Sequence, residues 1–273
     1  MNRDRLENLW FAIRPLLIYS ILFITVQAIA FRLMESLLLA LHVDMTVYYA
    51  GYRVIAEMLI LAAAVTAGLL PVLRDGQREV RKMQAGRGSA ILSAHEDRRM
   101  LGILMPVGTV CLSLALNILL MSVGAMAGNS AGTYVVDEIT AASLPMAAVV
   151  YGILTPFAEE LVYRGIVFTR LRTAFDPLSG AVISAFLFGL SHGNLRQGIY
   201  GSVMGLVFAA CYEASRIFAV PFLLHSLCNL TVLVMNSTDT FDLVDSPAWI
   251  TFFTAAAALC ALYWYRCLFE KNR

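Results

Sequence analysis

The sequence predicts an all-α membrane protein, a polytopic helical bundle of about eight transmembrane helices around a cavity that opens to the cytoplasm. Of its 273 residues, 59% are hydrophobic and only 14% are charged, and the mean hydropathy is +0.73. An ordinary soluble domain is about a quarter charged and less than about half apolar, so lipid must cover much of this surface. This composition excludes a cytosolic enzyme, a secreted disulfide scaffold and a disordered chain.

Eight stretches are candidates for membrane spans, since roughly 20 mostly apolar residues cross a ~30 Å hydrocarbon layer. They are residues 14–34, 53–73, 100–125, 144–164, 177–194, 198–212, 217–235 and 249–266. The fifth and sixth are short and nearly continuous, which predicts a tight turn at 195–197. The half-apolar stretch 37–52 is expected either along the interface or inside the protein as a partial helix.

The spans divide the chain into three parts. Residues 1–143 hold three membrane helices and a large cytoplasmic loop at 74–99, residues 144–235 form a core of four further spans, and residues 236–273 form an outer loop and the last helix. The first span imitates a secretory signal, because Arg14 precedes an apolar run that ends at Ala28-Ile29-Ala30. A cleaved signal is the alternative; we interpret the segment as an uncleaved signal anchor because seven more spans follow.

Basic residues predict the orientation. With the N-terminus inside and eight spans, 17 of the 20 Lys and Arg residues fall in cytoplasmic segments. We therefore expect a multi-pass protein of a bacterial inner membrane with both termini cytoplasmic. A net charge of +1 gives no sign of a nucleic-acid partner. Five cysteines, an odd number without metal-site spacing, are typical of apolar fillers rather than of a disulfide framework.

Ionisable side chains within the spans indicate where chemistry occurs. Each costs about 2.5–3.5 kcal/mol to insert into the membrane, so a protein keeps one only where it is paired or serves a function. Four positions qualify: Glu57, the pair Glu159-Glu160, His192 and His225. On a helix Glu160 and Arg164 lie one turn apart and can pair. Glu159, about 100° around the helix, is then left as a proton acceptor. The structural alternative is two interfacial glutamates beside an arginine that reaches the cytoplasmic surface.

Two further pairs stand at i, i+4 spacing, so each shares one helical face. The first is Phe188 and His192, with Gly189 and Gly193 allowing another backbone to approach. The second is His225 and Asn229. Taken singly, each has a plain structural explanation: a hydrogen-bonded packing histidine, or a polar pair that binds a neighbouring helix.

Together these groups are the parts of a peptide-hydrolysing centre. A carboxylate can take a proton from water, an imidazole can align that water or protonate the leaving amine, and His and Asn donors can bind an oxyanion. Ser226 and Cys228 lie off the His225 face, which disfavours covalent catalysis. Alternatively Glu159, His192 and His225 could hold zinc with an open position for water. The His-Glu-x-x-His motif is absent.

Glu159-Glu160-x-x-x-Arg164, Phe188-x-x-x-His192 and His225-x-x-x-Asn229 together resemble the motif set of the CPBP family. These are the intramembrane endopeptidases of the CAAX prenyl protease type II and bacteriocin-processing group, also called Abi. The resemblance covers roughly residues 144–235 and implies that these residues form the catalytic core. It implies that Glu159 and His192 activate water, that His225 and Asn229 bind the oxyanion, and that Glu160, Arg164 and Phe188 support the site.

The resemblance also implies that the partners are the lipid bilayer and a protein or peptide substrate. Such a substrate is prenylated in some members of the family, and the sequence does not decide this for the present chain. Zinc stays open too, and we favour the metal-free, glutamate-activated mechanism.

Two rival functions remain from the sequence. A transporter or proton relay would also use intramembrane Glu and His, and it would give Glu57 a role. An inverted repeat, which many transporters have, is not evident by eye. A non-catalytic immunity or scaffold protein of the same fold is the other rival.

Overall fold

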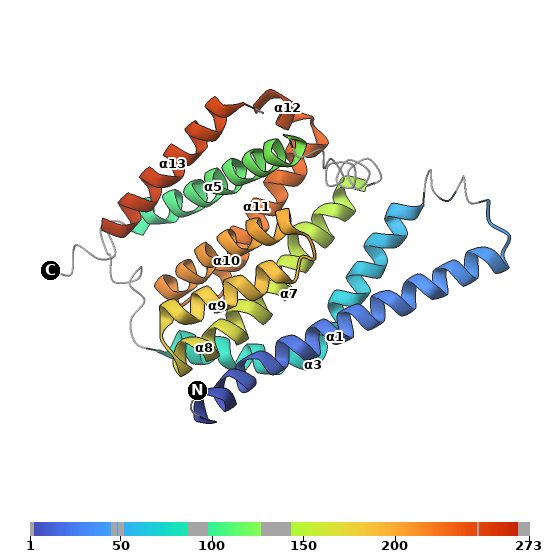
Figure 1. Cartoon of the computed structure of the whole chain (residues 1–273), viewed down its shortest axis with the longest axis horizontal. Helices are drawn as coiled ribbons and strands as arrows, with labels where there is room; N and C mark the ends of the chain where they lie inside the picture. Colours follow the sequence, from blue (N-terminus) through green and yellow to red (C-terminus); the bar gives the residue numbers. More distant parts are fainter. Residues whose placement is uncertain are drawn as a thin grey trace.

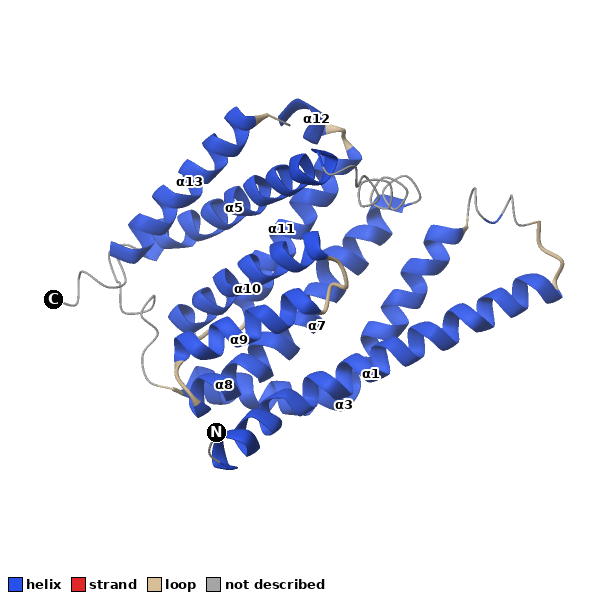
Figure 2. Cartoon of the chain, viewed as in Figure 1, coloured by secondary structure: helices blue, strands red, loops and turns tan. Residues whose placement is uncertain are grey.

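The computed structural model describes residues 3–44, 48, 52–86, 98–126, 143–244 and 246–266. Within these ranges the chain is helical throughout, apart from short turns, and it contains no strand (Figure 2). The prediction of an all-α bundle is therefore confirmed. In order, the longer helices are α1 (Arg3–Ala40), α3 (Arg53–Ala85), α5 (Arg98–Met126), α9 (Pro177–Leu190), α10 (Leu195–Ser215), α11 (Ala219–Ser237) and α13 (Pro247–Tyr265), with the short α12 (Thr240–Val244) before the last.

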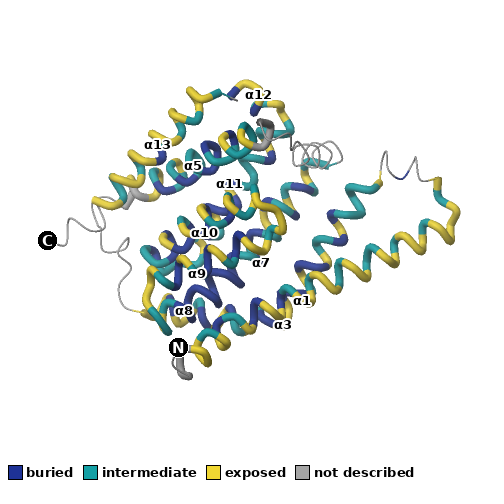
Figure 3. Tube along the Cα trace, viewed as in Figure 1, coloured by how far each residue is buried: buried dark blue, intermediate teal, exposed yellow. Residues whose placement is uncertain are grey.

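Between α5 and α9 runs one long helical segment with changing pitch. Its parts are η1 (Val150–Leu154), α7 (Thr155–Glu160), η2 (Leu161–Phe168) and α8 (Thr169–Ala174), where η1 and η2 are π-helices. Such widened turns are rare and often occur at functional sites. All eight residues of η2 are buried, so the core of the molecule sits around this segment (Figure 3).

Six of the described helices are long and apolar enough to cross a membrane. They correspond to six of the eight predicted spans. The other two exist as helices: α9 is apolar but has 14 residues, and α10 has 21 residues but is less apolar. The helix α1 packs along α3, α9 along α10, and α13 along α5 (Figure 1). On α13 only Ala257 is buried, as expected for a helix that faces lipid.

The turn between α9 and α10 lies at 191–194 rather than at 195–197, which corrects the prediction. The side chain of Asn194 accepts a hydrogen bond from the Gln197 N–H at 2.9 Å, so this cap starts α10 at Leu195. His192 consequently sits in the turn and not inside a span. Asp176 caps α9 in the same way, and its hydrogen bonds from Ser179 lower the pKa of the Asp176 carboxyl.

The two glycines predicted to admit another backbone behave differently. A Cβ at Gly189 would overlap the Gly198 carbonyl and the Ser202 side chain, so α10 approaches α9 through this gap. Gly193 has open space around it, and its role is conformational: its φ of +71° belongs to the left-handed region that favours glycine.

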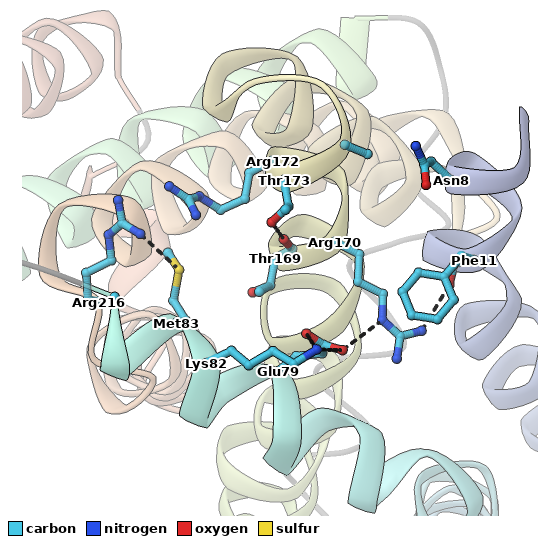
Figure 4. A pocket seen from close by; sticks show the side chains of 12 residues that line it. Asn8, Phe11, Glu79, Lys82, Met83, Thr169, Arg170, Arg172, Thr173 and Arg216 are labelled. Carbon is cyan, nitrogen blue, oxygen red and sulfur yellow. Dashed lines mark hydrogen bonds and ion pairs between the residues drawn. The ribbon is translucent and has the colours of Figure 1, made fainter. Parts of the chain in front are cut away.

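Arg170 ties α8 to α1 and α3 (Figure 4). Its side chain is 3% exposed and donates to Glu79 at 3.3 Å, to Asp75 at 2.9 Å and to the Phe11 carbonyl at 2.9 Å. The guanidinium also lies 4.0 Å from the centre of the Phe11 ring. A cavity of about 320 Å³ lies beside this network, and none of the predicted site residues lines it.

Replacing Arg170 by alanine is expected to destabilise the fold by about 2–3 kcal/mol, because it removes the buried donors of Glu79, Asp75 and the Phe11 carbonyl and leaves Glu79 paired only with the largely exposed Lys82 at 3.1 Å. The exposed pair Arg32–Glu35, at 3.5 Å, supplies the control. Arg32→Ala is expected to cost less than about 1 kcal/mol. Denaturation of both variants in detergent measures the difference; equal losses would contradict the structural role of Arg170.

Candidate active site

Glu160 and Arg164 form the centre of the candidate site. Arg164 Nη1 lies 2.8 Å from Glu160 Oε1, and both side chains are 0% exposed. The predicted i, i+4 pairing is therefore confirmed, and the alternative of an arginine reaching the surface is wrong. Arg164 also cannot count among the cytoplasmic loop residues that predicted the orientation, because the helical segment continues for ten residues beyond it to Ala174.

His225 connects the two adjacent carboxylates. Its Nδ1 lies 2.9 Å from Glu160 Oε1, and its Nε2 lies 3.7 Å from Glu159 Oε2. A carboxylate only accepts, so the hydrogen of Nδ1 points to Glu160 and Nε2 is the atom turned toward Glu159. The distance of 3.7 Å is too long for a direct hydrogen bond. Glu160 is fully buried, whereas the side chain of Glu159 is 18% exposed, so the two carboxylates have the different surroundings that the sequence predicts.

Aromatic rings enclose these groups. Phe188 meets the His192 ring edge-on at 4.9 Å and the His225 ring at 5.7 Å, and Arg164 lies 4.5 Å from its centre. The His225 ring stacks on Phe208 at 4.9 Å. Phe208 was not predicted, because an aromatic residue in an apolar helix gives no signal of its own. The rings surround the Glu160–Arg164 pair with apolar atoms, and this low-polarity setting strengthens the electrostatic interaction between the two charges.

His192 is held by the backbone. Its Nδ1 lies 2.9 Å from the Phe188 carbonyl oxygen, which can only accept, so Nδ1 donates and Nε2 keeps a lone pair in the neutral ring. The ring packs against α10, where a Cβ at Gly201 would lie 3.1 Å from it. His192 and His225 are both close enough to act electrostatically on Glu159.

Asn229 supplies a hydrogen bond that the helical backbone lacks. In η1 each N–H bonds the carbonyl five residues earlier, as Thr155 does with Val150. The next residue is Pro156, which has no N–H, so the Tyr151 carbonyl loses its partner. Asn229 Nδ2 donates to this oxygen at 3.0 Å. Because the amide has two hydrogens, one remains for another acceptor.

Several polar atoms of the cluster have no partner among the described residues. Glu160 Oε2 and the Nε and Nη2 atoms of Arg164 are buried without one. Such groups are costly unless water or a ligand binds them. These three atoms are the hydrogen-bonding positions that the described part of the cluster leaves unfilled.

The zinc hypothesis needs three ligands gathered at one point. In the part of the chain that the structure describes, His, Cys, Asp and Glu side chains form no such group. Glu159, His192 and His225 as they lie do not fit a three-ligand site, and we derive no step through a metal. Glu57, whose role the sequence left open, lies near the start of α3 and forms an ion pair with Arg53 at 3.5 Å.

The fold and this cluster define an integral membrane protein with an acid–imidazole centre buried between its helices. Residues 141–231 match the family model described as type II CAAX prenyl endopeptidase Rce1-like. The resemblance to this family that the three motifs predicted is thereby confirmed over the segment that carries them.

Two curated relatives are each similar to the chain over about 100 residues. One is YdiL of Bacillus subtilis, described as a candidate membrane peptidase, with 29% identity over 102 residues, 37% of this chain and 41% of the relative. Another is the membrane-embedded CAAX protease MroQ of Staphylococcus aureus, with 26% identity over 104 residues, 36% of this chain and 42% of the relative. The match spans about two fifths of each relative's length. No solved structure matches the chain significantly.

Proposed function

We propose that this chain is an intramembrane endopeptidase in which Glu159 activates water for attack on a peptide bond. The observation that carries the proposal is the position of His225 between a buried, arginine-paired Glu160 and a partly accessible Glu159. The match to type II CAAX prenyl endopeptidases supports the same reaction class. The substrate is a membrane-associated protein or peptide, including CAAX-like C-termini; prenylation is not required by the proposal.

The proposed reaction uses only side chains of the cluster. Glu159 accepts a proton as the water oxygen bonds to the carbonyl carbon, and His192 orients that water. The tetrahedral intermediate places negative charge on the former carbonyl oxygen. Protonated His225, stabilised by Glu160 through Nδ1, donates from Nε2 to this oxyanion, and the second amide hydrogen of Asn229 donates as well. The C–N bond then breaks as the proton passes from Glu159 to the leaving amine.

The membrane placement is part of the proposal. The excess of basic residues in the predicted inner segments supports a bacterial inner membrane with both termini cytoplasmic.

The test is cleavage of membrane-peptide substrates by the purified chain, before and after chelation, with elemental analysis of the same samples. We expect cleavage, and we expect it to continue in zinc-free protein because Glu159 supplies the base. Activity that is lost on chelation and restored by zinc would overturn the metal-free mechanism but not the peptidase. Absence of cleavage of any tested membrane protein by the folded, inserted chain would contradict the peptidase itself.

A further inference from the structure

The helix α3 is longer than a membrane needs. Its 33 residues extend roughly 50 Å at ~1.5 Å per residue, whereas the hydrocarbon layer is ~30 Å thick. The apolar part ends at Leu73, and Arg74 is the first residue beyond it. The last three turns of α3 therefore lie beyond the acyl chains.

One outward face runs the whole length of this helix. Its exposed residues follow each other at steps of three or four: Leu59, Ala63, Thr66, Leu70, Arg74, Arg78, Arg81 and Ala85. In the apolar part this face points to lipid. The same face becomes basic within one turn, from Leu70 to Arg74, so the first arginine stands where acyl chains give way to headgroups.

The opposite face fixes the rotation of the helix. Gly76 lies so close to Leu161 that a Cβ would stand 2.7 Å from its side chain. Glu79, buried on the same side, bonds Arg170 of α8. The three arginines cannot turn inward without breaking this packing, so they stay on the outer surface of the bundle.

Within the part of the chain that the structure describes, little negative charge offsets the basic residues of the outward face. Arg74 and Arg81 form no ion pair with any other described residue, and Arg78 reaches Asp75 only at 4.0 Å. Asp75 is already bound by Arg170 at 2.9 Å. An open groove of about 540 Å³ runs along the face, lined by Arg74, Gln77, Arg78, Arg81, Lys82 and Ala85.

We propose that Arg74, Arg78 and Arg81, the α3 basic face, bind the phosphate groups of anionic phospholipids. Guanidinium groups match phosphate oxygens with paired hydrogen bonds, and basic residues next to a span are attracted to an anionic leaflet. The continuity with the lipid-facing surface favours a headgroup over a soluble anion. This binding is independent of the proposed peptidase activity.

The test titrates the full chain in detergent with phosphatidylglycerol or phosphatidylcholine and counts bound lipids by native mass spectrometry. The triple variant Arg74→Gln/Arg78→Gln/Arg81→Gln is expected to lose phosphatidylglycerol affinity by about ten- to a hundredfold, since each of the three basic side chains contributes up to roughly fivefold. Phosphatidylcholine binding should not change. The corresponding triple lysine variant keeps the charge and should keep most of the affinity, and Arg32→Gln, an exposed arginine elsewhere, should match the wild type.

Two results would overturn the proposal. One is wild-type phosphatidylglycerol affinity in the triple glutamine variant. The other is displacement of the lipid by an equal concentration of inorganic phosphate, which would make the groove a site for the free anion. Salt provides a check that needs no variant, because raising KCl should weaken phosphatidylglycerol binding to the wild type.

Discussion

Glu159→Gln is expected to lower the turnover number for peptide cleavage by about 10²–10⁴-fold, the usual contribution of a general base. The amide keeps the size of the side chain but cannot accept the proton of water. Glu159 is partly exposed and makes no short hydrogen bond with His225, so the fold should tolerate the change. We therefore expect an unchanged melting temperature in detergent beside a large loss in kcat.

Glu160→Gln is the matched control, because it alters the neighbouring carboxylate by the same atoms. Glu160 is fully buried and bonds both Arg164 and His225. Its replacement leaves a buried arginine without a counter-charge, so the variant should lose stability as well as rate. If Glu159→Gln cleaved at the wild-type rate, Glu159 could not be the base. If both variants lost stability equally, the proposed division of roles would be wrong.

The parts of this site that could be predicted from sequence are those fixed within one helix. Glu160 pairs with Arg164 because residues one turn apart lie on the same face, and His192, in the turn directly after α9, still meets Phe188 four residues earlier. The spans were also predictable, since hydropathy over about 20 residues reports on the thickness of the bilayer. Both kinds of inference need no knowledge of how helices pack.

The remaining features depend on packing between distant segments. His225 reaches Glu160 across 65 residues and Asn229 reaches Tyr151 across 78, and neither spacing leaves a trace in the sequence. The charged residues after Leu73 predicted a cytoplasmic segment that was either a solvated helix or a linker, and the structure shows that α3 continues to Ala85. In the fold they divide into a buried side that binds Arg170 and an outer basic face.

The two roles proposed for the Asn229 amide, a backbone hydrogen bond and an oxyanion contact, can be measured separately by restoring the backbone donor that Pro156 lacks. Asn229→Ala is expected to cost about 1–3 kcal/mol of stability, because the Tyr151 carbonyl is left without a donor. It should also lower kcat by about 10²–10³-fold if the second hydrogen binds the oxyanion. Pro156→Ala supplies an N–H at the position where η1 needs one.

In the double variant Pro156→Ala/Asn229→Ala, we expect the stability to return toward that of Pro156→Ala while kcat stays low. Thermal denaturation and single-turnover cleavage of the wild type, both single variants and the double variant complete the cycle. If both quantities recover together, Asn229 acts only by holding the turn that carries Glu159, and the oxyanion role is wrong. If neither recovers, the missing N–H of Pro156 is not the reason why the Tyr151 carbonyl needs Asn229, and the backbone explanation fails. Because the backbone defect and the oxyanion contact involve different hydrogens of one side chain, only the combined variant distinguishes them.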